Sequence, residues 1–177
     1  HPWVKNNPDF YAKNKDGKMI SPFDWTDVVK LDYTNQKMRQ NMISEMEFWI
    51  KNAQIDGFRC DVAMEVPRDF WDTASKKLNK TKKIIMLMEA EQPDLMQQAF
   101  DMQYGWEAHH LMNDIVKNKK TVLDWNNYIQ NRTQKYAVDD ITMNFTSNHD
   151  ENSWNGTEYE RLGNAVETFA TLSFMTP

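Results

Sequence analysis

This 177-residue chain contains three carboxylates and one arginine that lie at or just after the ends of apolar segments. Their types and spacing could support catalysis. Arg59 and Asp61 lie two residues apart in IDGFRCDVA, so a strand there places both side chains on one face. Glu89 directly follows the apolar run IIMLM, and Asp150 ends the stretch ITMNFTSNHD. A charged pair on a half-buried strand is costly unless its members are paired or used.

Carboxylates that meet at one site repel each other, so their convergence points to chemistry that uses them. Hydrolysis of a glycosidic bond needs such a pair. One carboxylate attacks the anomeric carbon while a protonated partner donates to the leaving oxygen, with about 5–5.5 Å between them in a retaining enzyme. Arg59 would keep Asp61 charged and oriented as the nucleophile, and Glu89 would need a less polar site in which to stay protonated. The alternative is that Arg59 and Asp61 form a structural ion pair.

The elements that carry these residues are expected to alternate between helix and strand. Apolar residues at steps of three and four predict a helix over 36–53, followed by a strand over 57–61. A helix is expected to open at Pro67, since proline suits a first turn. The apolar run Ile84–Met88 is typical of a strand that is buried on both faces of a parallel sheet.

The second half of the chain continues the alternation. A weaker strand is expected near 99–102, a helix over 122–136 and a strand with one polar face from Ile141. Thr157 and Glu160 predict a capping box at the start of a last helix that runs to Met175. This order predicts a parallel α/β sheet, either doubly wound or part of an eight-stranded barrel. In a barrel, the C-terminal ends of the strands form the catalytic rim, where the three acids are expected.

Composition excludes several classes of function. The net charge is −5 and the basic residues are scattered, which argues against a nucleic-acid partner. No stretch is long and apolar enough to span a membrane. Cys60 is the only cysteine, so neither a disulfide framework nor a cysteine-rich zinc site is expected. There are five glycines and no glycine-rich phosphate loop, which disfavours nucleotide binding.

Three segments resemble, in order, sequence blocks of the α-amylase family, glycoside hydrolase family thirteen. They are DGFRCDVA at Asp56–Ala63, IIMLMEAE at Ile84–Glu91 and FTSNHD at Phe145–Asp150. The stretch FDWTDVVKLDYTNQKMR resembles the family's connection from domain B to the third barrel helix. The resemblance implies part of a (β/α)8 TIM barrel over 34–177, roughly from the third to the seventh helix. Residues 1–33 would be the end of a short, irregular domain B.

Carried over position by position, the resemblance makes Asp61 the nucleophile and Glu89 the general acid/base. Asp150 would hold sugar hydroxyls and favour the distorted transition state. Glu91 competes with Glu89 for the acid role, but Glu89 adjoins the strand and is preferred under the logic of the rim.

The resemblance also predicts the residues that surround the three acids. Arg59 would support the nucleophile, and His149 would hydrogen-bond the sugar in the central subsite. Trp154, just after the third block, would either stack on a sugar ring or anchor its loop.

The implied activity is that of a retaining α-glycosidase acting on α-linked glucans such as starch or maltodextrin, by hydrolysis or transglycosylation. The partner is an oligosaccharide or polysaccharide, no cofactor is required, and a structural calcium is possible in the full-length protein. Many α-amylases carry a Lys-His pair after the nucleophile, whereas Val62-Ala63-Met64-Glu65 follows here. This difference argues against a preference for internal starch bonds and against the associated calcium ligand. The short domain B argues in the same direction and favours smaller α-glucans or branch points.

The chain is expected to be an internal piece of a longer protein, since a complete barrel needs roughly 250 residues. The family's first conserved block is absent, and TLSFMTP stops where the eighth strand is expected. Open sheet edges in such a piece would favour self-association. No targeting signal is visible in these residues, so the compartment stays undecided.

Two other classes of function remain open. A non-catalytic barrel relative could serve as a carbohydrate-binding or scaffold module, but it would be expected to have lost one of the three acids. A metal-dependent hydrolase could use His149, Asp150, Asp61 and His109, although their spacing is poor for ligands. His109 and His110 are adjacent and should point apart, so they are interpreted as ordinary helix or loop residues.

Overall fold

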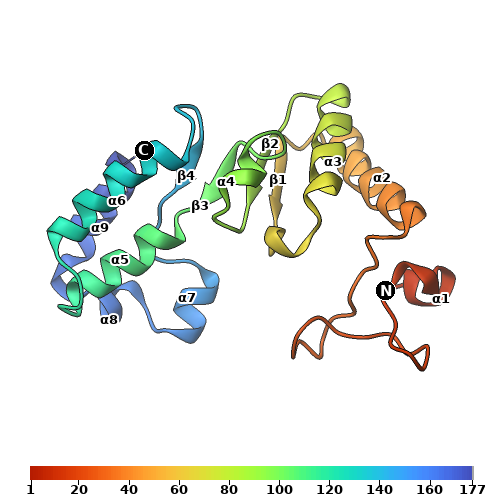
Figure 1. Ribbon diagram of the computed structural model, residues 1–177, viewed down its shortest axis with the longest axis horizontal. Helices are drawn as coiled ribbons and strands as arrows, with labels where there is room; N and C mark the ends of the chain where they lie inside the picture. The colour runs from red at the N-terminus through yellow and green to blue at the C-terminus, as the bar shows by residue number, and fades with distance from the viewer. Residues whose placement is uncertain (177) are drawn as a thin grey trace. The chain divides into compact units, whose positions relative to one another are not determined.

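The structure is a computed structural model, and it describes residues 1–176. The chain forms two compact units (Figure 1). The first contains His1–Asp56 and Val66–Ile84, and the second contains Gly57–Glu65 and the residues from Ile85 onward. The division into 1–33 and 34–177 expected from the sequence stays a prediction. Across residues 1–176, no helix has the length and apolar character needed to cross a membrane.

The first unit begins with an irregular segment, as the sequence predicts. It holds the short helix α1 (Trp3–Asn6) and the 3-10 turn η1 (Pro8–Phe10). Isolated antiparallel bridges join Tyr11 to Leu31 and Lys13 to Met19. A small apolar core of Phe10, Tyr11 and Met38 ties this segment to the following helix.

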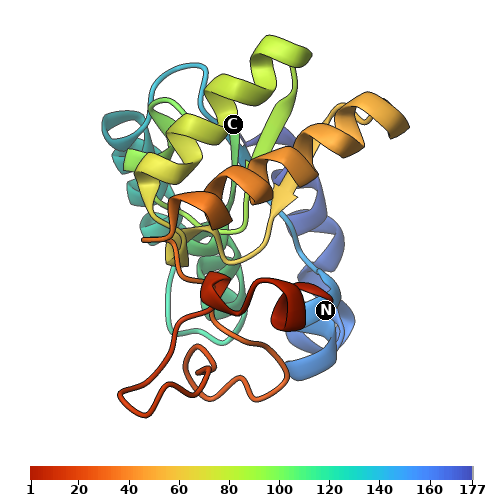
Figure 2. The ribbon, with the colours of Figure 1, turned by 90° about the vertical axis from the view of Figure 1, so that its right-hand side faces the viewer.

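Two helices complete the first unit and lie side by side (Figure 2). The predicted helix over 36–53 is confirmed as α2 (Gln36–Ala53). The helix begins after Asn35, whose side chain accepts hydrogen bonds from two free amides of the first turn. Helix α3 spans Arg68–Thr81. Pro67 precedes α3 as its N-cap residue and does not sit in the first turn as expected, since its ψ of 134° is extended. An ion pair of 2.7 Å joins Arg39 of α2 to Asp69 of α3.

The second unit is built on a four-stranded parallel sheet in the order β1-β2-β3-β4, which confirms the predicted fold class. The strands follow one another from yellow to blue in Figure 1. Gly57 is required where β1 meets β2, because a Cβ atom there would lie 2.0 Å from the Ile85 carbonyl oxygen. The strands are β1 (Gly57–Cys60), β2 (Ile85–Met88), β3 (Met102–Tyr104) and β4 (Ile141–Met143).

The two faces of this sheet differ in burial. Cys60, Met86 and Met88 are buried on one face. The register places Arg59 opposite Leu87 on the other face, where Ile85 is 55% exposed. The prediction that Ile84–Met88 is buried on both faces is therefore wrong, because side chains alternate along β2 and the described residues cover only one face at Ile85.

Helix α5 (Trp106–Val116) was not recognised in the sequence, apart from the assignment of its histidines to a helix or loop. The reason is chemical: His109 and Asn113, four residues apart, occupy buried positions where the periodicity rule looks for apolar side chains. The helix α6 (Val122–Lys135) confirms the prediction over 122–136. Short helices α4 (Pro93–Met96) and α7 (His149–Trp154) were also missed.

Other boundaries shift by a few residues. The strand expected near 99–102 is β3, which begins at Met102, and β4 is shorter than the alternating stretch suggests. The last helix is interrupted at Gly163, whose φ of 51° is left-handed, so it forms α8 (Glu158–Leu162) and α9 (Val166–Met175). The capping box of Thr157 and Glu160 is confirmed.

Candidate active site

One guanidinium bridges two of the predicted acids at the C-terminal ends of β1 and β2. Asp61 is the first residue after β1, and Glu89 is the first residue after β2. Arg59 Nη1 hydrogen-bonds Asp61 Oδ1, and Arg59 Nη2 lies 2.6 Å from Glu89 Oε1 in an ion pair. The parallel register thus brings Arg59, Asp61 and Glu89 together, as the sequence predicts.

The backbone after β1 holds this arrangement in place. The Glu89 amide donates to the Cys60 carbonyl at 2.9 Å, and the Val62 amide donates to Glu89 Oε2 at 2.9 Å. Val62 has a φ of 43°, which is unusual for a β-branched residue and costs on the order of 1–3 kcal/mol. Strain of this kind persists where surrounding contacts impose it, and here Glu89 supplies one of them.

The two acids have different surroundings. The Asp61 side chain is 75% exposed, whereas the Glu89 side chain is 11% exposed. Asp61 is therefore open to a ligand, and Glu89 is largely shielded from water. The two neighbouring carboxylates thus differ in exposure, but the less polar site expected for Glu89 is not found, because Arg59 and the Val62 amide contact its two oxygens.

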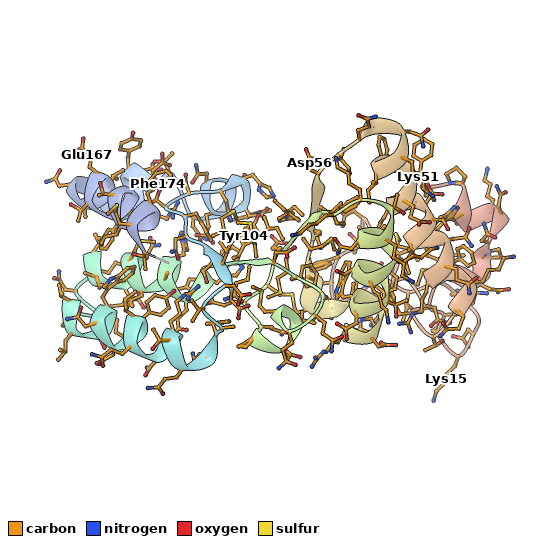
Figure 3. All side chains as sticks on the ribbon, turned by 90° about the horizontal axis from the view of Figure 1, so that it is seen from above. Lys15, Lys51, Asp56, Tyr104, Glu167 and Phe174 are labelled. Carbon is orange, nitrogen blue, oxygen red and sulfur yellow. The ribbon has the colours of Figure 1, made fainter. Side chains whose placement is uncertain are left out.

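Tyr104, which the sequence reasoning missed, is the third partner of Arg59. It ends β3 and is buried; its side chain is labelled in Figure 3. Its hydroxyl accepts a hydrogen bond from Arg59 Nε at 3.2 Å, and the guanidinium carbon lies 5.5 Å from the ring centroid. The sequence could have indicated Tyr104 as a residue at a strand end, but the strand was predicted near 99–102 and therefore ended before it.

These contacts keep Arg59 charged. Burial acts to lower its pKa, but the hydrogen bonds to Tyr104 and Asp61 and the nearby charge of Glu89 outweigh burial, so the pKa is raised. On the opposite face of β1, burial raises the pKa of the Cys60 thiol to about 12. Cys60 is therefore a packed thiol and not a nucleophile at neutral pH.

Glu91, the competitor for the acid role, has a different partner. Its Oε2 accepts a hydrogen bond of 2.6 Å from the Glu107 amide in the first turn of α5. Burial raises the pKa of this carboxyl. Glu91 thus contacts a helix end, whereas Glu89 contacts Arg59.

The third acid does not lie where the sequence predicts. Asp150 was expected to close a strand, but β4 ends at Met143 and Asp150 lies in the first turn of α7. Its Oδ2 lies 3.3 Å from His149 Nε2, and both side chains are exposed. Within residues 1–176, no hydrogen bond or ion pair joins Asp150 to Asp61 or Glu89. Trp154 ends the same helix with 83% exposure, which leaves its ring open to a ligand.

The histidines considered as metal ligands lie on α5. His109 is buried and hydrogen-bonded, and His110 stacks on Trp106 with 5.9 Å between ring centroids. In the described part of the chain, no group of three or more His, Cys, Asp or Glu side chains is arranged to hold a metal ion. The side chains considered for the alternative of a metal-dependent hydrolase therefore do not form a cluster there.

Comparison with known proteins gives one family match over most of the chain. The model of the α-amylase catalytic domain matches residues 11–174. A cyclomaltodextrinase from Thermoanaerobacter pseudethanolicus is 27% identical over 128 residues, which are 68% of this chain and 22% of that protein. An intracellular maltogenic amylase from Bacillus subtilis is 29% identical over 87 residues, which are 49% of this chain and 14% of that protein. The chain thus spans less than a quarter of these relatives.

Solved structures agree in fold. The crystal structure of a maltogenic α-amylase from Thermotoga neapolitana matches with a TM-score of 0.78 and 33% identity over 84% of this chain and 35% of that one. An α-amylase from Lactobacillus plantarum matches with a TM-score of 0.77 and 28% identity, over 84% of this chain and 39% of that one. The parallel sheet and its helices correspond to part of the barrel in these proteins.

Proposed function

This chain belongs to the α-amylase catalytic-domain family, and from that premise we propose that the full-length protein is a retaining glycoside hydrolase acting on α-linked glucans. The observation that carries the proposal is the bridge formed by Arg59 between Asp61 and Glu89 at adjacent strand ends. A barrel rim with two carboxylates in different environments supports acid-assisted attack on an acetal.

The proposed reaction has two displacements. Asp61 attacks the anomeric carbon and forms a covalent glycosyl ester, while Glu89 gives its proton to the leaving oxygen. Glu89 then takes a proton from water, which attacks the same carbon and releases Asp61. Two inversions preserve the α configuration of the product. If a second sugar takes the place of water, the same steps result in transglycosylation.

The contacts of Glu89 suggest which oxygen carries the proton. Oε2 accepts from the Val62 amide, so Oε1 is the atom left to exchange a proton with the substrate. Oε1 also meets Arg59. We therefore propose that Arg59 releases Glu89 and keeps Asp61 when the acid acts, with Tyr104 holding the guanidinium during the exchange.

The residues of α7 complete the proposed site. His149 and Asp150 are exposed and carry a donor and an acceptor for sugar hydroxyls, and the open ring of Trp154 suits stacking on a sugar. The names of the relatives, a cyclomaltodextrinase and a maltogenic amylase, support maltodextrins as substrates. The preference for small α-glucans or branch points, a structural calcium ion and self-association through open sheet edges also stay predictions.

The test is hydrolysis of maltoheptaose by the full-length protein, with the first product followed by proton NMR. We expect the α anomer to form first and to convert slowly to the β anomer by mutarotation. Cellohexaose, which has β linkages, serves as the control substrate and should not be cleaved. Initial release of the β anomer would contradict a retaining mechanism. Binding of maltoheptaose without cleavage would favour the non-catalytic carbohydrate-binding relative.

The hydroxyl of Tyr104 supplies a further prediction. Tyr104→Phe keeps the ring against Arg59 but removes the acceptor at Nε, so Arg59 and Asp61 lose orientation. Hydrogen bonds to charged groups contribute about 1.5–3 kcal/mol, and we expect kcat/KM on maltoheptaose to fall roughly 10- to 100-fold. Tyr128→Phe is the matched control, since Tyr128 is buried on α6 and its hydroxyl has no hydrogen-bond partner in residues 1–176. Equal loss in both variants would show that Tyr104 acts only through packing.

A further inference from the structure

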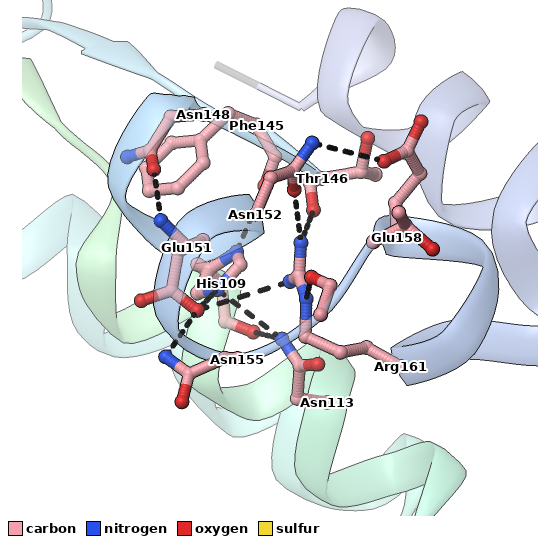
Figure 4. Close-up of polar contacts among 12 residues, drawn as sticks. His109, Asn113, Phe145, Thr146, Asn148, Glu151, Asn152, Asn155, Glu158 and Arg161 are labelled. Carbon is pink, nitrogen blue, oxygen red and sulfur yellow. Dashed lines mark hydrogen bonds and ion pairs between the residues drawn. The ribbon is translucent and has the colours of Figure 1, made fainter.

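A largely buried polar cluster lies where three helices of the second unit meet (Figure 4). His109 belongs to α5, Glu151 to α7 and Arg161 to α8. His109 Nε2 lies 3.1 Å from Glu151 Oε2, and Arg161 Nη1 lies 3.8 Å from the same oxygen. His109 is 1% exposed. Burying these polar groups is costly, so the cluster needs a reason beyond packing.

His109 holds the segment between β4 and α7 at two points. Its ring stacks on Phe145 with 4.6 Å between centroids and an angle of 15°, and its Nδ1 lies 3.3 Å from the Phe145 carbonyl oxygen. Six residues later, its Nε2 meets Glu151. The residues between these two contacts include His149 and Asp150. One imidazole therefore fixes both ends of the segment that carries them.

Helix α7 depends on such contacts because it has no apolar core of its own. It is six residues long and contains no buried residue. Isolated helices shorter than about 12–15 residues are marginal in water, so a helix of this length needs tertiary anchors. The anchors are polar: besides the contacts of Glu151, the Asn152 Oδ1 accepts from Arg161 Nη2 at 3.1 Å.

The charge of Glu151 fits the role of an anchor. Burial acts to raise its pKa, but hydrogen bonds from His109 and Asn155 and the positive charge of Arg161 outweigh burial and lower it. Glu151 is therefore an ionised acceptor at neutral pH. It is adjacent to Asp150 in sequence, so any movement of Glu151 also moves Asp150.

The cluster is also continuous with the carboxylate site. The Phe145 ring that stacks on His109 contacts the ring of Tyr104, with 5.6 Å between centroids. Tyr104 in turn holds Arg59. A single aromatic contact therefore separates the partner of Arg59 from the imidazole that holds α7.

We propose that His109 is a positioning residue: by hydrogen-bonding Glu151 and stacking on Phe145, it sets the place of α7 and thereby of His149 and Asp150 at the substrate. The catalytic part of this inference rests on the proposed function. His109 itself does not touch the substrate and acts through the peptide segment that it holds.

The test is His109→Phe in the full-length protein, which keeps a flat ring on Phe145 and removes both ring nitrogens. Hydrogen exchange measured by mass spectrometry should become about tenfold faster in a peptide covering α7 and stay unchanged in one covering β1, since only the anchor of α7 is lost. The kcat/KM for maltoheptaose should fall roughly 10- to 100-fold, as expected for misplacement of a substrate-binding group.

A double variant separates positioning from general loss of stability. In an Asp150→Asn background, His109→Phe should cause a smaller loss of kcat/KM than in the wild type, because the contact of Asp150 is already impaired and only that of His149 remains to be misplaced. Thr142→Val is the matched control: Thr142 is buried on β4, and its hydroxyl accepts from Arg132 of α6 at 2.6 Å without touching α7. If His109→Phe does not fold, His109→Gln retains a donor toward Glu151 and should show a smaller change of the same kind.

Each outcome bears on the inference separately from the proposed function. Unchanged exchange in α7 would overturn the anchor, whatever the activity. Faster exchange with unchanged kcat/KM, or a full multiplicative loss in the Asp150→Asn background, would overturn the positioning role. A wild-type protein that does not cleave maltoheptaose would instead refute the proposed function, and faster exchange in His109→Phe would still support the anchoring of α7.

Discussion

Asp61→Asn is expected to lower kcat on maltoheptaose roughly 10⁴-fold, because an amide cannot form the covalent glycosyl ester. KM should change far less, since the amide keeps the shape of the side chain and a contact to Arg59 is still possible. A mass measurement provides a second readout. A fluorinated glycosyl fluoride that traps the intermediate should add one glycosyl mass to the wild-type peptide that contains Asp61, and nothing to the variant.

The chain contains a close match for this site as a control. The Asp69 side chain is 72% exposed and pairs with Arg39 at 2.7 Å, so Asp69→Asn removes an equally exposed partner of an arginine. Exposed pairs contribute about 0–1 kcal/mol, and we expect Asp69→Asn to leave kcat within about twofold of the wild-type value. If Asp61→Asn kept most of the activity, or the trapped sugar were found on another residue, the nucleophile would lie elsewhere.

Glu89→Gln is expected to lower kcat on maltoheptaose by about 10²- to 10⁴-fold, the usual contribution of a general acid. The loss should be much smaller for α-maltosyl fluoride, because fluoride leaves without a proton. This dependence on the leaving group distinguishes a proton donor from a nucleophile. Asp61→Asn, by contrast, should be impaired on both substrates.

Glu47→Gln is the control for burial and charge. The Glu47 side chain is 15% exposed and pairs with Lys77 at 3.3 Å, so it resembles Glu89 in both respects. It lies on α2 in the other unit, and its replacement should lower stability without a dependence on the leaving group. Equal loss of Glu89→Gln activity on maltoheptaose and on maltosyl fluoride would assign Glu89 a structural role. A Glu91→Gln variant that keeps its activity on maltoheptaose would further support Glu89 as the acid, since Glu91 contacts α5 and not Arg59.

The contacts among Arg59, Asp61 and Glu89 were predictable because the pairing of adjacent parallel strands fixes which residues lie side by side. Once two apolar runs are recognised as adjacent strands, the residues that follow them must meet at one edge. The position of Asp150 could not be predicted in the same way, because residues 144–148 connect β4 to α7 and are not paired with a neighbouring strand. The position of α7 depends on His109, and a histidine in a helix pattern gives no sign of the contact it makes.

Other differences follow from what periodicity measures. The helix over 36–53 was predictable because its buried positions are apolar, among them Met38, Ile43 and Ile50. Helix α5 was not, because His109 and Asn113 are buried through hydrogen bonds that no hydropathy pattern represents. The prediction that both faces of β2 are buried was wrong, because an apolar run shows only that the side chains are apolar and not what covers each face. Ile85 shows the difference.

Cys60 ends β1, the strand that carries Arg59, and its buried thiol can serve as a chemical probe. It is the single cysteine of these 177 residues, it is buried, and it precedes Asp61 directly. A maleimide can react with its sulfur only when the packing around the end of β1 opens. The labelling rate in native buffer therefore measures how often the surroundings of the strand that presents Asp61 open, without a denaturant and without a substrate. The chain thus contains its own chemical probe for opening of the proposed catalytic edge.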